Sequence, residues 1–60
     1  MNQLAIITAL SYGFTVCFKT SRYEVQNRAG KLLAVNLYDH STEVLTHATA
    51  QLCFVKAGSV

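Results

Sequence analysis

The stretch YGFTVCFKTSRYEVQNRAGKLLAVNLY, Tyr12–Tyr38, has the pattern of three antiparallel strands joined by two short turns. The clearer turn is Arg28-Ala29-Gly30, because a glycine at the third position of a three-residue loop can adopt the positive φ that closes the hairpin. Closing the hairpin there sets Val25 opposite Leu33, and opposite residues share a face of the sheet. The spacing therefore predicts a hairpin centred on residues 28–30.

The second turn assigns the same apolar face independently. A tight turn at Thr20-Ser21 sets Val16 opposite Val25, and a slip of one residue would move every apolar side chain to the other face. The predicted apolar face carries Phe14, Val16, Phe18, Tyr23, Val25, Leu33, Val35 and Leu37. The predicted open face carries Arg22, Glu24, Gln26, Leu32, Ala34, Asn36 and Tyr38.

A C-terminal helix is expected to cover the apolar face. Residues 41–52 place apolar side chains at helical spacing, and Ser41 or Asp39 can cap the first turn. Gly58 would supply the stop. Phe54 and its neighbours also favour a strand, so residues 50–56 are either the end of the helix or a fourth strand. The fold predicted is α+β: an antiparallel sheet of three to four strands, rich in hairpins, with one C-terminal helix packed on its apolar face.

Residues 2–10 precede this core as a separate segment. Apolar and small residues alternate from Leu4 to Phe18, and a straight strand of that length would run roughly 50 Å. The chain must therefore bend, and Gly13 is the expected place. Residues 2–10 are then either a strand or a short helix.

The composition predicts association with a second copy. A chain of 60 residues makes a single domain, spanning residues 1–60, and buries only about 60% of its unfolded surface. Yet 52% of its residues are hydrophobic and only 13% are charged. We therefore expect a homodimer, although residues 2–10 could instead fold back as a fourth strand of a monomer. The expected interface is formed by Leu4, Ile6, Ile7 and Leu10.

Cellular location is predicted from the apolar run and the cysteines. The run Leu4–Leu10 is far shorter than the roughly 20 residues that span a bilayer, and no basic residue precedes it as in a signal peptide. An intracellular, cytoplasmic protein is expected, with Cys17 and Cys53 as free thiols.

Neither catalysis nor a metal site is expected from the reactive side chains. The candidates for a nucleophile, a base and an orienting group are Cys17 or Cys53, His40 or His47, and Asp39 or Glu43. Glu43 and His47 stand four apart, which is typical of a surface pair on the expected helix. The set His40, Glu43 and His47 lacks a fourth zinc ligand, and no cofactor is expected.

Two binding functions fit these features. The first is a small non-enzymatic protein-interaction module, an inhibitor or regulatory adaptor of the kind found among phage and mobile-element accessory proteins, using its open face and a sheet edge. The alternative is a weakly basic nucleic-acid-binding or transcriptional regulatory protein, in which Arg28 and Lys31 contact phosphates. The predicted partner-binding residues are Arg22, Glu24, Gln26, Arg28, Lys31, Asn36 and Tyr38.

Overall fold

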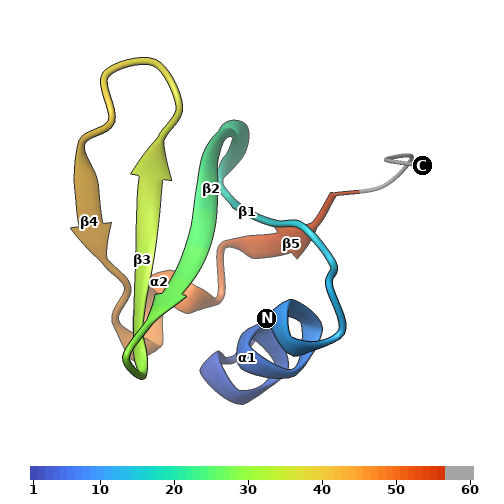
Figure 1. Ribbon diagram of the computed structural model, residues 1–60. Helices are drawn as coiled ribbons and strands as arrows, with labels where there is room; N and C mark the ends of the chain where they lie inside the picture. Colours follow the sequence, from blue (N-terminus) through green and yellow to red (C-terminus); the bar gives the residue numbers. More distant parts are fainter. Residues whose placement is uncertain (57–60) are drawn as a thin grey trace.

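Five strands form one antiparallel sheet in the computed structural model, which describes residues 1–56 (Figure 1). The elements in chain order are α1 (Gln3–Ser11), β1 (Val16–Phe18), β2 (Thr20–Arg28), β3 (Lys31–Asn36), β4 (Thr42–Val44), α2 (His47–Ala50) and β5 (Cys53–Val55). The strand order is β4-β3-β2-β1-β5. The chain is thus a small α+β protein with an antiparallel sheet. The stop predicted at Gly58 lies outside the described residues.

The predicted position of the helix is wrong. The longer helix, α1, is N-terminal, and residues 41–52 contain β4 and only the four residues of α2. The N-terminal cap of α2 explains why this helix starts late. Thr46 Oγ1 accepts a hydrogen bond from the Thr49 amide at 3.1 Å, and Thr49 Oγ1 accepts one from the Thr46 amide at 2.8 Å. This capping box starts a helix well after Ser41, which instead lies in the loop between β3 and β4.

Residues 2–10 form a helix rather than a strand. Asn2 caps α1, since its Oδ1 accepts a hydrogen bond of 2.7 Å from the Ala5 amide. The helix ends at Ser11 with Tyr12 as its C-cap, and the following Gly13 has φ +89°, a left-handed conformation that glycine adopts without strain. The expected bend at Gly13 is therefore the C-terminal end of a helix.

The predicted register between β2 and β3 is wrong by one residue. Arg28 pairs with Lys31, so the loop contains only Ala29 and Gly30, both with positive φ. Asn27 Oδ1 accepts from the Gly30 amide at 3.1 Å and supports this two-residue turn. The shorter loop turns Leu32 and Ala34 toward the core, and Leu33 and Val35 to the opposite face.

The predicted register between β1 and β2 is confirmed where the two strands pair regularly. Cys17 lies opposite Glu24, which is the alignment that sets Val16 opposite Val25. The turn itself differs from the prediction. The register shifts between Cys17 and Phe18, so that Phe18 pairs with Thr20 and only Lys19 lies between them. Lys19 has φ +63°.

Residues 53–55 settle the alternative left open for the C-terminal segment. They form β5, which pairs antiparallel with β1 at the edge of the sheet, as a fifth strand rather than a fourth. In Figure 1, β2, β3 and β4 stand upright, whereas β1 and β5 cross at a large angle to them. The sheet is therefore strongly curved.

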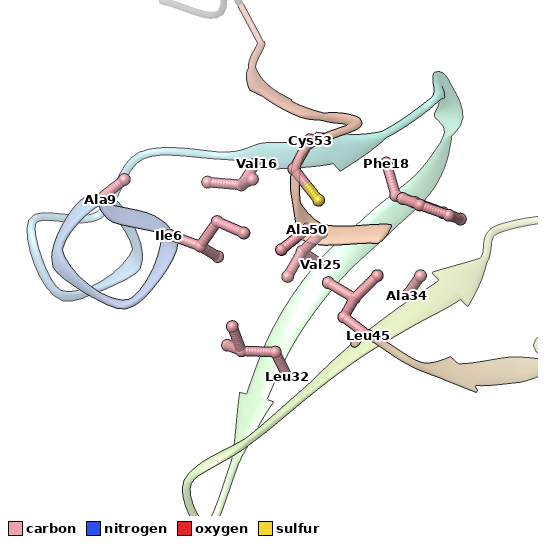
Figure 2. Close-up of a cluster of buried hydrophobic side chains, with 10 residues drawn as sticks. All are labelled: Ile6, Ala9, Val16, Phe18, Val25, Leu32, Ala34, Leu45, Ala50 and Cys53. Atoms are coloured by element: carbon pink, nitrogen blue, oxygen red, sulfur yellow. The ribbon is translucent and has the colours of Figure 1, made fainter. Parts of the chain in front are cut away.

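The core lies where this curved sheet meets the two helices (Figure 2). Ile6 of α1 and Ala50 of α2 are completely buried and lie in one cluster with Val16 and Val25. The other members of that cluster are Ala9, Phe18, Leu32, Ala34, Leu45 and Cys53. Val35 is also buried, but it lies outside this cluster.

Candidate interaction surface

The side of the sheet that faces away from α1 is called the open face here. Val25 points into the core, so its neighbours Glu24 and Gln26 point to the other side. Cross-strand partners share a face, which places Lys31 with Arg28 and Cys17 with Glu24. The open face carries Cys17, Arg22, Glu24, Gln26, Arg28, Lys31, Leu33, Val35, Thr42, Val44, Phe54 and Lys56.

The structure brings together most of the residues predicted to bind a partner. Arg22, Glu24, Gln26 and Arg28 follow one another along β2, and Lys31 lies opposite Arg28 on β3. Tyr38 joins them from the loop after β3, because the Arg22 guanidinium lies 5.5 Å from the centre of its ring.

Asn36 does not belong to this surface. It pairs with Tyr23 on the core side of the sheet, and its Oδ1 accepts from the amides of Tyr38 at 2.8 Å and Asp39 at 3.3 Å. These bonds close the loop between β3 and β4. Asn36 was therefore misplaced by the same one-residue error in the register of β3.

Positive charge is concentrated on the open face. Arg22, Arg28, Lys31 and Lys56 lie there, four of the five basic residues of the chain, and Glu24 is the only acidic one beside them. Lys56 extends the edge of the sheet, since its amide donates to the Thr15 carbonyl at 2.8 Å. The other two acidic residues lie elsewhere: Asp39 in a loop, and Glu43 opposite Ala34 on the core side of β4.

Apolar side chains flank this charged row. Leu33 and Val35 stand beside it on β3, followed by the exposed Val44 on β4, and Phe54 lies at the opposite edge of the sheet. None of these four residues was predicted on the open face; Val44 and Phe54 are exposed there, Leu33 is half-buried and Val35 is buried. The register error placed Leu33 and Val35 on the core face, although the burial expected of Val35 is found on the other face. The alternation of Cys53 and Val55 inward with Phe54 and Lys56 outward is the signal that identifies β5.

Cys17 lies in the middle of the open face but is buried there. Its cross-strand neighbours are Glu24 on one side and Phe54 on the other. Burial raises the pKa of the Cys17 thiol, partly offset by Lys56 and reinforced by Glu24. Burial likewise raises the pKa of Cys53, whose side chain faces the core. Both cysteines are unpaired and favour the protonated thiol over the nucleophilic thiolate.

The residues predicted as an oligomer interface divide into two groups. Ile6 cannot contact another chain, because it is fully buried in its own core, and Ile7 and Leu10 are half-buried against that core. Leu4 is 72% exposed. It lines a cavity of about 540 Å³ that we call the α1 groove, formed by Asn2, Leu4, Ala5, Thr8, Ala9, Tyr12, Phe14 and Val55.

The remaining reactive side chains are dispersed. Glu43 lies in β4 and His47 begins α2, so they do not form the predicted pair on one helix. Hydrogen bonds from Ser41 lower the pKa of Asp39, which closes a turn by accepting from the Ser41 amide at 2.9 Å. Within residues 1–56, no three His, Cys, Asp or Glu side chains gather where they could hold a metal ion. None of the helices in the same range is long and apolar enough to cross a membrane.

Comparison of the chain with protein-family models, with curated proteins and with solved structures finds no match. The geometry of the surface is therefore the basis on which a function is assigned.

Proposed function

We propose that the protein is a small non-enzymatic interaction module that binds an acidic, partly apolar segment of a partner protein across its open face. The observation that supports this most directly is the segregation of charge: Arg22, Arg28, Lys31 and Lys56 share one face with a single acidic residue. Complementary charge speeds association and selects the partner. The carboxylates of an acidic segment could accept hydrogen bonds from several of these Arg and Lys side chains, because all of them lie on the same face of the sheet.

The apolar residues of the open face favour a protein over a nucleic acid. Val44 and Phe54 give a partner side chain apolar surface at both edges of the basic row. Phosphates would meet a different arrangement: Arg22 and Arg28 stand roughly 20 Å apart along β2, with the carboxylate of Glu24 between them. That carboxylate interrupts a continuous phosphate path.

The face, rather than an edge of the sheet, is the proposed contact. β4 and β5 are the edge strands, and each has only three residues. Short edges and charged neighbours discourage the addition of a further strand. We propose that such a module acts as a regulatory adaptor or an inhibitor. We also propose a reducing, intracellular location, which is in keeping with two unpaired thiols. The analogy with phage accessory proteins adds no support, since it depended on a C-terminal helix.

A photo-crosslinking residue tests the proposal in cells. Placed at Gln26, in the middle of the open face, it should capture one dominant protein. Placed at Ala48, which is exposed on α2, it should not. Combining the Gln26 probe with either Arg28→Gln or Lys31→Gln should reduce capture several-fold, while Lys19→Gln, which removes the one basic residue outside the open face, should leave it unchanged.

Two outcomes would contradict the proposal. Equal capture from Gln26 and Ala48 would remove the open face as the site. Crosslinking to RNA or DNA, together with binding of a 20-nucleotide single strand that weakens steeply between about 50 and 200 mM salt, would favour the nucleic-acid function instead.

A further inference from the structure

The α1 groove is lined mainly by residues 2–14, a part of the chain that has no charged side chain. Residues 1–18 contain no Asp, Glu, Lys, Arg or His side chain, although the chain as a whole has eight Asp, Glu, Lys and Arg residues. Tyr12 is 77% exposed, and Phe14 is 56% exposed. A surface helix normally turns charged residues to water. Here the exposed side of α1 offers an apolar groove whose polar side-chain groups, those of Asn2, Thr8 and the Tyr12 hydroxyl, are all neutral.

The pattern along α1 is self-complementary. Leu4, Thr8 and Tyr12 recur at intervals of four and form a ridge, and Ala5 and Ala9 make the floor beside it. If two copies of α1 pack antiparallel about a two-fold axis at Thr8, Leu4 of each meets Tyr12 of the other, and Thr8 meets Thr8. The small floor residues allow the two helices to approach closely.

Electrostatics favour the same arrangement. The antiparallel pair places the positive end of each helix dipole beside the negative end of the other. A charged partner segment would find no side chain of opposite sign around the groove, in contrast to the open face. The occupant that fits an uncharged, self-complementary helix surface is the same surface of a second copy.

We infer that the protein forms a two-fold symmetric homodimer through the α1 grooves. Aromatic side chains bury about 150–250 Å² each, so the exposed parts of Leu4, Tyr12, Phe14 and Val55 supply roughly 450 Å² per protomer. The total of about 900 Å² lies below the usual range for stable complexes, and a reversible dimer in the micromolar range is expected. The open faces lie on the other side of each sheet, so both stay free in the dimer.

Sedimentation velocity on the full chain from 5 to about 500 µM, in 150 mM salt, tests this inference. The wild type should shift reversibly from monomer to dimer. Thr8→Glu and Thr8→Lys should each weaken association at least tenfold, because each puts like charges together at the axis. An equimolar mixture of the two variants should restore a dimer. Ala48→Glu and Ala48→Lys are the matched controls on α2 and should dimerise as the wild type does, and circular dichroism should show that every variant is folded.

Three results would overturn the inference: a wild type that stays monomeric at 500 µM, a dimer that tolerates both charges at Thr8, or a loss of association that is as large for the Ala48 variants. A slowly exchanging dimer that ignores Thr8 would indicate exchange of α1 between protomers instead. None of these results bears on binding at the open face, because the crosslinking experiment reads a different side of the sheet.

Discussion

Ala29 is one of the non-glycine residues that the structure describes with a positive φ, together with Lys19 and His40. It has φ +52° in the loop between β2 and β3, a left-handed conformation that costs an L-residue roughly 1 kcal/mol or more. The adjacent Gly30, at φ +85°, adopts the same region without a Cβ penalty. The loop thus has the backbone of a two-residue type I′ turn, for which Asn-Gly is the preferred sequence.

Ala29→Asn should therefore stabilise the protein by about 0.5–1 kcal/mol, because asparagine tolerates the left-handed region better than alanine does. For a domain of this size, such a gain raises the melting temperature by several degrees. Gly30→Ala is the control and should lower it, even though an added Cβ would meet no atom within 4 Å. A lower melting temperature for Ala29→Asn would show that the loop does not hold two left-handed residues.

The two buried thiols predict how stability depends on pH. The pKa values of Cys17 and Cys53 are raised in the folded chain, so the folded state holds these protons more tightly than the unfolded state. Their contribution is complete below the unfolded pKa of about 8.5 and is lost as pH rises through the folded values.

Urea unfolding at pH 7 to 10 measures this contribution. Lysine and tyrosine titrate in the same range, so the informative quantity is the difference between the wild type and the double variant Cys17→Ala, Cys53→Ala. The wild type should lose stability more steeply above pH 8.5 than the variant. Parallel curves for the two proteins would show that the thiols are not protected by burial.

At the scale of elements, the start of α2 depends on one capping residue. Thr46→Ala removes the hydrogen bond that Thr46 Oγ1 accepts from the Thr49 amide, and should cost about 1 kcal/mol. Ser41→Ala is the comparison, because the sequence analysis placed the helix start there, and it should cost less. A larger effect at Ser41, measured by thermal unfolding, would contradict the position of α2.

The elements differ in how well the sequence predicts them. Val16 and Val25 were placed together because β1 and β2 alternate clearly between apolar and polar residues. In β3, Leu32, Leu33, Ala34 and Val35 are all apolar, so alternation cannot distinguish a two-residue loop from a three-residue loop ending in the same Gly30. For α1, the helical pair Ile6 and Ala9 was obscured by apolar residues that also alternate with period two.

The candidate surface was predicted only where a strand alternates clearly between apolar and polar residues. Every predicted binding residue on β2 lies on the open face, where the alternation is clear. Leu33 was misplaced by the length of the β2–β3 loop, whereas Phe54 and Lys56 reach that face only through the pairing of β5 with β1, which joins distant parts of the chain. Local pattern carries no information about such pairs, and the assignment of Lys56 depends on knowing that β5 lies beside β1.

At the scale of the whole molecule, the pairing of β5 with β1 has a consequence for synthesis. Residues 16–18 leave the ribosome long before residues 53–55, and at about 5–20 residues per second the interval is roughly 2–7 s. Until then one edge of β1 is unpaired, and Ile6 lacks its neighbours Ala50 and Cys53. The nascent chain therefore leaves its first 18 residues, which have no charged side chain, incompletely packed, and it completes its core only when β5 emerges.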